Sequence, residues 1–313
     1  MLLRDIPNGQ QRQPIFMSIN RPYIGRFAPT PSGPLHQGSL VAALASYLDA
    51  HHHRGKWLLR MEDLDPPRED RAASELIPQQ LLAHGLKWHG AMTYQSHNHR
   101  RYQETLAQLK GKNLLFPCTC SRKMLAAQAG LHQGDCHSLD PDQPTATARP
   151  HAWRLPVSDE VWWCEDRVYG HYGHNLMNAV GDPVLKRKDG PYAYQLAVVV
   201  DDHDAGINQV VRGLDLLDNT PRQLYLMACL DYEPPQYLHL PLMLNPAGQK
   251  LSKQNKARAL DLSTPLQNLL SALRFLQQPL PPAELSEHTQ QILDWAIRHW
   301  RVAAIPPHRA GVM

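Results

Sequence analysis

Apolar positions in the N-terminal part of the chain alternate between short continuous runs and a helical repeat. Residues 23–27 predict a strand. The segment GKWLLRMEDLDPP, residues 55–67, predicts a second strand that Pro66 and Pro67 end. Because strand, helix and strand follow one another, we expect a βαβ unit, a parallel sheet and an α/β fold. The helix between the strands is predicted from apolar residues at i, i+3, i+4, i+7 and i+8, namely Leu40, Ala43, Leu44, Tyr47 and Leu48.

A polar segment interrupts this pattern. Residues 117–156 are rich in Cys, His, Pro and Asp and have little periodicity, which indicates an insertion. The sheet pattern then resumes. YQLAVVVDDH (194–203) is interpreted as an apolar strand covered on both faces, and INQVVRG (207–213) as another strand, after which Thr220 and Pro221 predict the N-cap and first residue of a helix.

The chain after residue 256 is predicted to be helical. Thr264 and Pro265 begin one helix, and Ile292, Trp295 and Trp300 mark another. The apolar face of the first helix is predicted to hold Leu266, Leu269, Leu270 and Leu273.

Length and composition indicate a folded enzyme of one or two domains. The chain has 313 residues, 42% of them hydrophobic, and a net charge of +3, which permits a nucleic-acid partner without requiring one. It has neither an apolar run long enough to span a membrane nor a signal peptide. We therefore expect a cytoplasmic monomer with a mobile extension at residues 1–20 and no membrane partner.

Three cysteines, Cys118, Cys120 and Cys136, lie close together in the sequence. In a chain without export signals this clustering favours a metal site over disulfides. Three thiols leave one zinc ligand to find, and His132 and His137 are the candidates. The alternative is three reduced cysteines without a metal. Cys164 and Cys229 are expected to be buried apolar side chains.

The segment RFAPTPSGPLHQGSL, residues 26–40, joins the first predicted strand to the first predicted helix. Ligands of parallel sheets bind beyond the carboxyl ends of strands, where helix N-termini offer N–H groups to phosphate. His36 can donate to a phosphate, and Gly38 lets a flat base approach the backbone. A second segment, KLSKQ at residues 250–254, carries two lysines on a loop. Each segment alone is more often structural, but the ordered pair is far more specific.

This pair resembles the HIGH and KMSKS signatures of the class I aminoacyl-tRNA synthetases. RFAPTPSGPLHQGS, RMEDLDPPR, YQLAVVVDDHDAGINQVVRGLDLL and KLSKQN resemble the glutamyl branch of that class across nearly all of residues 21–256. One departure is Ser39, which stands where HIGH has its second histidine and carries no charge.

The resemblance implies a Rossmann-type parallel sheet with a zinc-containing insertion and a short helical C-terminal region. It divides the chain into the extension (1–20), the first catalytic half (21–98), an inserted acceptor-end-type domain (99–188), the second catalytic half (189–247), and a KMSKS-like loop with a helical region (248–313). No anticodon-binding domain is expected.

The resemblance also implies that the chain activates glutamate with ATP, which brings Mg²⁺ with it. His36 and Lys253 would be catalytic. Arg26 and Arg212 would pair with the substrate carboxylates and Glu62 with its ammonium group; the alternative for each arginine is a structural salt bridge. The implied ATP-binding residues are His36, Gly38, Ser39, Lys250, Ser252 and Lys253. The implied glutamate-binding residues are Arg26, Phe27, Ala28, Pro29, Thr30, Glu62, Tyr194 and Arg212.

Within this branch the chain most resembles the glutamyl-queuosine tRNA(Asp) synthetases, which have Cys-x-Cys, a tyrosine, three residues and a cysteine. His132 takes the tyrosine's place, so the implied zinc ligands are Cys118, Cys120, His132 and Cys136. These short paralogues transfer glutamate to the queuosine base of tRNA(Asp). The alternatives are a truncated synthetase that charges tRNA(Glu), an adenylyltransferase acting on a small molecule, and a catalytically inactive RNA-binding protein.

Overall fold

The computed structural model describes residues 21–65, 69–127, 130–132, 136–137, 150–244, 248, 258–307 and 310–312. Its centre is a seven-stranded sheet in which neighbouring strands run parallel except for the last pair, β6 and β7. The predicted parallel sheet and α/β fold are therefore confirmed. In spatial order the strands are β3 (Thr93–Tyr94), β2 (Lys56–Met61), β1 (Ile24–Phe27), β9 (Gln209–Gly213), β10 (Gln236–Leu240), β6 (Val161–Asp166) and β7 (Gly170–Asn175).

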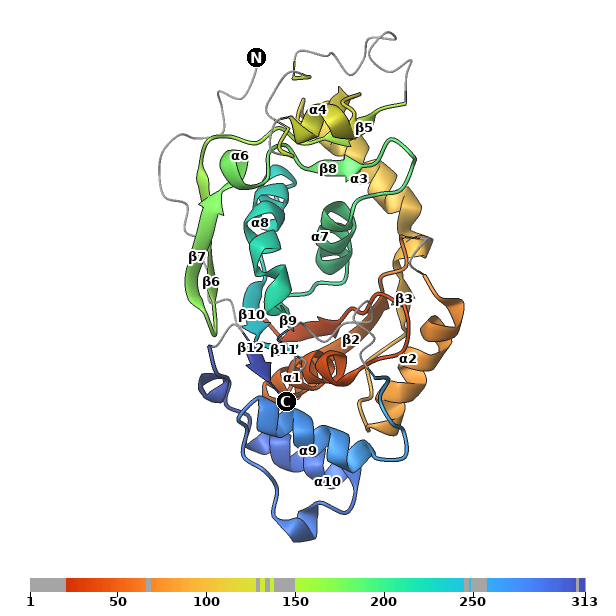
Figure 1. Ribbon diagram of the computed structural model, residues 1–313, viewed down its shortest axis with the longest axis vertical. Coiled ribbons are helices and arrows are strands. Elements are labelled where there is room, and N and C mark those ends of the chain that lie inside the picture. The colour runs from red at the N-terminus through yellow and green to blue at the C-terminus, as the bar shows by residue number, and fades with distance from the viewer. Residues whose placement is uncertain are drawn as a thin grey trace.

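Helices cover both faces of this sheet (Figure 1). On one face lie α1 (Gln37–His52), α9 (Pro265–Phe275) and α10 (Thr289–Arg298), whose apolar side chains share one core cluster with β1 and β2. On the other lie α7 (Tyr194–Asp204) and α8 (Thr220–Cys229), which share a second cluster with α3 (His99–Gly111) and β10. The sheet is thus the middle of three layers, and the carboxyl ends of its parallel strands lie between two cores.

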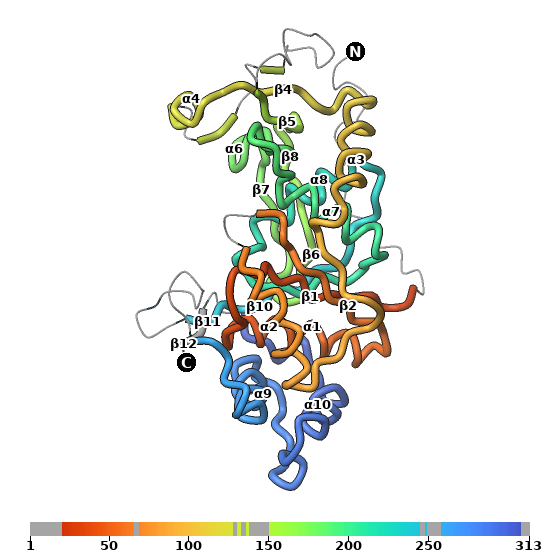
Figure 2. Tube along the Cα trace, turned by 90° about the vertical axis from the view of Figure 1, so that its right-hand side faces the viewer, coloured from red at the N-terminus to blue at the C-terminus, as the bar shows by residue number. Residues whose placement is uncertain are grey.

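Smaller elements complete the molecule. An antiparallel sheet of β4 (Phe116–Cys118), β5 (Ala152–Arg154) and β8 (Val184–Lys186) lies at the end of the elongated molecule opposite α9 and α10 (Figure 2). A parallel pair joins β11 (Leu242–Leu244) to β12 (Ala310–Val312). The remaining helices include α2 (Arg71–Ala83), α4 (Arg122–Ala126), α6 (Leu176–Ala179), η2 (Gln95–Asn98), η3 (Leu214–Asn219), η4 (Ala283–Leu285) and η5 (Val302–Ala304).

The prediction that YQLAVVVDDH forms a strand is wrong, because these residues form helix α7. Residues 196–202 are all buried, so the helix has no long polar face and its sequence lacks a helical repeat. A continuous apolar run does not distinguish a buried strand from a buried helix, and the three consecutive valines favoured the strand. Asp201, Asp202 and His203 therefore lie in the last turns of a helix and do not end a strand.

Two helix ends differ from the prediction by one or two residues. Helix α8 begins at Thr220 with Asn219 as its N-cap, one residue earlier than predicted. Helix α10 ends at Arg298, so Trp300 lies beyond it. The prediction for α9 is confirmed, with Thr264 as N-cap and Pro265 in the first turn.

The predicted domain divisions stay predictions, and residues 1–20 lie outside the described residues. Strands β6 and β7 fall within the predicted insertion, yet they extend the main sheet beside β10. None of the helices in the described part of the chain combines the length and apolar character that crossing a bilayer requires.

A buried carboxylate, Asp49 of α1, ties three parts of the fold together. Its oxygens accept hydrogen bonds from Tyr23 Oη at 2.6 Å, from both Nη atoms of Arg167, at 2.5 and 2.9 Å, and from Trp300 Nε1 at 2.9 Å. Burial alone would raise the pKa of Asp49, but Arg167, Tyr23 and Trp300 offset it, and the net pKa is lowered. The contact fixes the C-terminal region on α1.

We expect Asp49→Ala to lower the free energy of unfolding by about 3 kcal/mol, because it leaves Arg167 without its anion and two buried donors without an acceptor. Urea unfolding followed by circular dichroism measures this. Glu104→Ala, which removes an exposed carboxylate, should leave the urea midpoint of unfolding unchanged.

Because the folded pKa of Asp49 is depressed, the stability that Asp49 contributes is present above its unfolded pKa of about 3.9 and is lost as pH falls below that value. An Asp49→Ala variant as stable as the parent protein would contradict this role.

Candidate functional site

His36 is the N-cap of α1, at the carboxyl end of β1. Its Nδ1 accepts a hydrogen bond from the backbone N–H of Ser39 at 3.2 Å. In the neutral imidazole the proton is then on Nε2, so Nε2 is the donor. The helix therefore begins with a histidine whose tautomer is set by its own first turn, beside N–H groups that favour an anion.

Gly38, Met243 and Ala259 complete this end of the helix. A Cβ at Gly38 would lie 3.1–3.2 Å from the His36 ring, so a side chain there would press on the imidazole. Ala259 forms a β-bridge with His36, and Leu260 N donates to Leu35 O. The same Cβ at Gly38 would lie 3.8 Å from Met243 of β11. Lys250, Ser252 and Lys253 lie outside the described residues, but the segments before and after them both reach this helix start.

A buried charge network joins β1, β2 and α7. Asp202 of α7 accepts from Arg26 Nε at 3.1 Å and from Arg60 Nη1 at 2.7 Å, and Arg60 Nη2 donates to Glu62 at 3.2 Å. All four side chains are at most 9% exposed. Burial alone would raise the pKa of Asp202, but the two arginines more than offset it and the pKa is lowered. Burial raises the pKa of Glu62, and the neighbouring arginines offset this rise only in part.

Arg26 and Arg212 differ in how their charge is balanced. Arg26 contacts Asp202 through Nε, so the salt-bridge alternative holds for that nitrogen. Arg212 of β9 donates to His239, Gln223, Thr220 and the carbonyl oxygen of Leu216, all neutral acceptors. In the described part of the chain Arg212 forms no ion pair, although it is 5% exposed. A buried guanidinium without an anion is a favourable place for an incoming carboxylate.

Tyr194, the first residue of α7, lies in the same electrostatic neighbourhood. Burial and the charge of Glu62 raise the pKa of its hydroxyl to about 12, while Arg212 and Arg26 act to lower it. The structure therefore brings the buried Arg26, Glu62 and Arg212 and the partly buried Tyr194 into one electrostatically coupled region. Phe27 differs, because its ring packs on Trp57 in the core. The loop Ala28–Thr30 is fixed to β2's end by a bond from Glu62 N to Pro29 O, 3.0 Å long.

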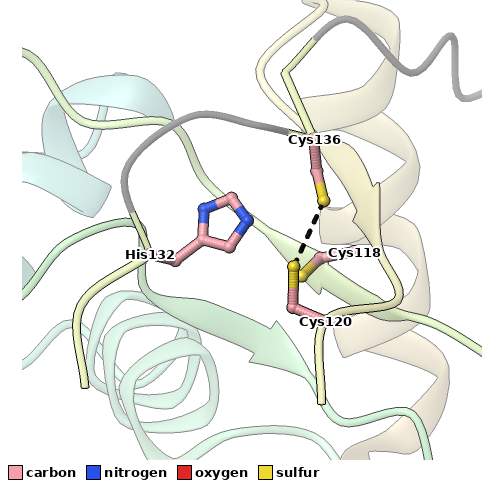
Figure 3. Close-up of side chains that lie close together, drawn as sticks. All are labelled: Cys118, Cys120, His132 and Cys136. Atoms are coloured by element: carbon pink, nitrogen blue, oxygen red, sulfur yellow. Dashed lines mark hydrogen bonds between the residues drawn. The ribbon is translucent and has the colours of Figure 1, made fainter. Parts of the chain in front are cut away.

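The predicted ligands Cys118, Cys120, His132 and Cys136 converge on one point (Figure 3), with ligand atoms all within 4.8 Å of one another. The sulfur atoms of Cys120 and Cys136 are 3.6 Å apart. Burial raises the pKa of Cys136 to about 12 and also raises that of Cys120, so both remain thiols unless a cation displaces their protons. Three sulfurs and one imidazole could hold a metal ion.

His132 has the contacts of a metal ligand on both sides of its ring. Its Nδ1 lies 2.7 Å from Asp182 Oδ2, and its Nε2 is buried without a hydrogen-bond partner in the described part of the chain. A carboxylate behind an imidazole fixes the tautomer that leaves the other nitrogen for a metal. His137 instead places Nε2 on the same Asp182 oxygen, also at 2.7 Å. The fit therefore favours His132 over His137 in the four-residue group.

Several residues of these sites were not predicted from the sequence. Arg60 lies inside an apolar strand pattern and has no motif around it. Asp202 follows a run of apolar residues and was not predicted as a site residue. Asp182 and His239 are far in sequence from the residues they contact, so spacing gave no signal. The buried cysteines Cys164 and Cys229 are confirmed as buried.

Comparison with known proteins identifies the family. The family described as "tRNA synthetases class I (E and Q), catalytic domain" matches residues 24–268. A "Glutamyl-Q tRNA(Asp) synthetase" of Neisseria meningitidis is 48% identical over 91% of this chain and 98% of its own length. The chain belongs to this family of class I tRNA synthetases. A protein of the same name from Pseudomonas fluorescens is 50% identical over 92% of this chain and 95% of its own length. The predicted family resemblance is confirmed.

Solved structures agree on the fold. A glutamate tRNA ligase from Elizabethkingia meningosepticum, in complex with its amino acid, matches with a TM-score of 0.76 and 23% identity. The match covers 92% of this chain and 66% of that one. A glutamate-tRNA synthetase from Elizabethkingia anophelis gives the same TM-score over 94% of this chain and 68% of its own. Both share the class I synthetase fold.

Proposed function

We propose that this chain activates L-glutamate with ATP and transfers it to the queuosine base of tRNA(Asp). The observation that carries the glutamate step is the buried, unpaired charge of Arg212 in the region that also holds Arg26, Glu62 and Tyr194. The RNA acceptor is supported by the names of relatives that match this chain over almost their whole length.

The amino-acid site would recognise glutamate by its charges. Arg212 would bind one carboxylate, with Arg26 Nη atoms available for the other because Asp202 occupies Nε. Glu62 and the Tyr194 hydroxyl would receive the ammonium group. Glutamine has only one carboxylate, so it would leave one of the two arginines without an anion. A buried site built for a charged group strongly rejects an uncharged analogue.

The ATP site would lie at the start of α1. His36 Nε2–H and the first N–H groups of the helix would hold phosphates, and Lys250, Ser252 and Lys253 would approach from the segment between β11 and Ala259. A substrate carboxylate oxygen would attack the α-phosphorus of ATP and pyrophosphate would leave; Mg²⁺ that comes with ATP would neutralise phosphate charge. A hydroxyl group of the RNA then attacks the acyl carbon, and AMP leaves. Ser39 contributes a backbone N–H that orients His36.

The metal site would hold Zn²⁺ through Cys118, Cys120, His132 and Cys136. Three thiolates and one imidazole make a closed four-ligand set, which is typical of structural zinc. The metal would tie Cys118 of β4 to Cys136 and to His132, which Asp182 supports, without a part in the reaction.

We expect Arg212→Ala to lower kcat/KM for glutamate on the order of 100-fold, because it removes a charge-assisted pair worth about 3 kcal/mol. Glutamate-dependent ATP–pyrophosphate exchange measures this. Arg100→Ala, which changes an exposed arginine on α3, is the matched control and should leave exchange unchanged. Greater exchange with glutamine or aspartate than with glutamate would refute the amino-acid assignment.

The RNA acceptor is tested by incubating the protein with ATP, labelled glutamate and one tRNA at a time. We expect label on tRNA(Asp) that carries queuosine and none on tRNA(Asp) that lacks it. Label on tRNA(Glu) would instead support conventional charging. Equal label on both forms of tRNA(Asp) would exclude the queuosine base as acceptor.

We expect one equivalent of zinc in the purified protein and a loss of at least half of it in His132→Ala, because His132 Nε2 faces the sulfurs. Elemental analysis after dialysis against a chelator measures this. His137→Ala is the matched control, since it removes the other histidine on Asp182 and should keep the metal. Unchanged zinc in His132→Ala would show that His132 is not a ligand.

A further inference from the structure

A buried imidazole stands between the charge of Arg212 and a carboxylate. His239 of β10 is the register partner of Arg212 in the parallel pair β9–β10, and it is fully buried. Arg212 Nε donates to His239 Nε2 at 3.0 Å, and His239 Nδ1 lies 2.7 Å from Asp166 Oδ2. The three side chains form a line across β9, β10 and β6.

The partners of His239 determine its protonation. Asp166 also accepts from the backbone N–H groups of His239, Val168 and Tyr169, at 2.9, 3.0 and 2.9 Å, so its oxygens are all engaged as acceptors. Nδ1 must therefore donate to it. A guanidinium can only donate, so Nε2 must accept. His239 is therefore the neutral Nδ1–H tautomer. Burial lowers the pKa of His239, which also favours the neutral form.

This arrangement fixes Arg212 without neutralising it. The guanidinium lies over the Tyr237 ring, 5.1 Å from its centroid, and its other donors meet Gln223 and Thr220 at 2.8 Å. Direct contact with Asp166 would fix it equally well but would cancel its charge, as Asp202 does for Arg26. Because the imidazole of His239 lies between Asp166 and Arg212, the guanidinium is held in position while its charge stays able to attract an anion.

We propose that His239, oriented by Asp166, is a positioning residue that holds Arg212 as an uncompensated cation for the carboxylate of the amino-acid substrate. This inference rests on the proposed glutamate function. The groups that face His239 are Asp166 from β6, Arg212 from β9, Asp215 from η3 and Tyr237 from its own strand. Protonation of His239 would place a donor against the Arg212 Nε–H and would displace the guanidinium.

Two near-isosteric variants separate positioning from packing. A glutamine can place its side-chain oxygen near the former Nε2 and accept from Arg212, whereas an asparagine reaches only the Asp166 side. We expect His239→Asn to raise KM for glutamate about tenfold or more, with kcat and KM for ATP changed less than about threefold. His239→Gln should keep KM for glutamate within about threefold of the parent value.

The measurement is ATP–pyrophosphate exchange at varied glutamate and ATP, with unfolding curves for each variant. The proposal would be overturned if His239→Asn and His239→Gln had equal KM for glutamate, or if kcat fell equally in both while KM stayed unchanged. Either result would show that His239 acts only by packing. No glutamate-dependent exchange in the unmodified protein would overturn the proposed function itself, before any variant is compared.

A second test uses the pH dependence of KM for glutamate. In the unmodified protein KM for glutamate should rise as pH falls below about 6.5, the ordinary pKa of histidine, while KM for ATP stays level, because a protonated His239 disturbs Arg212. The rise should be smaller in His239→Gln, in which the titration of Glu62, whose pKa is raised, still remains. A flat profile for glutamate, or the same rise in His239→Gln, would contradict the role of His239.

Discussion

The pairing of Asp202 with two arginines is the constraint on which the site depends. A carboxylate that is 4% exposed is stable only with cationic or hydrogen-bonding partners, and Arg26 and Arg60 supply both. These arginines come from adjacent parallel strands, and Asp202 comes from the last turns of α7. The network therefore sets the position of the buried helix on the sheet. Tyr194, at the other end of that helix, lies where the charges of Glu62 and Arg212 act on its hydroxyl.

The same network explains why two similar arginines have different chemistry. Arg26 shares the charge of Asp202 with Arg60, whereas Arg212 is held by an imidazole, an amide, a hydroxyl and a carbonyl oxygen. A pocket that binds a dicarboxylic amino acid needs at least one cation whose charge the protein leaves available. Balancing every arginine internally would give a more stable but non-binding site, which is the usual conflict between stability and function.

Local sequence patterns predicted the N-terminal part of the fold correctly. Where burial or strand register determines the structure, the sequence did not predict it. Strand β1, the start of α1 at His36, and helix α9 were predicted because the sequence signals of each element lie within a few residues of one another. Helix α7 was assigned as a strand because burial on all sides removes the periodicity that marks a helix. Arg60 was missed because its strand reads as apolar, and the partners of Arg212 are set by the register of β9 and β10, which sequence spacing does not reveal.

The cluster of His132 and three cysteines shows how one residue type requires another far away. A tyrosine at position 132 would present a single oxygen to the cation, but a histidine brings a second nitrogen that must also be satisfied when buried. Asp182 meets that requirement at 2.7 Å, and its pKa is lowered because contacts with His137 and His132 outweigh the effect of burial. Gly181 makes the approach possible: a Cβ there would come within 2.7 Å of the His132 backbone. The imidazole of His132 is therefore coupled to Asp182, fifty residues later, and the two side chains are best regarded as one unit.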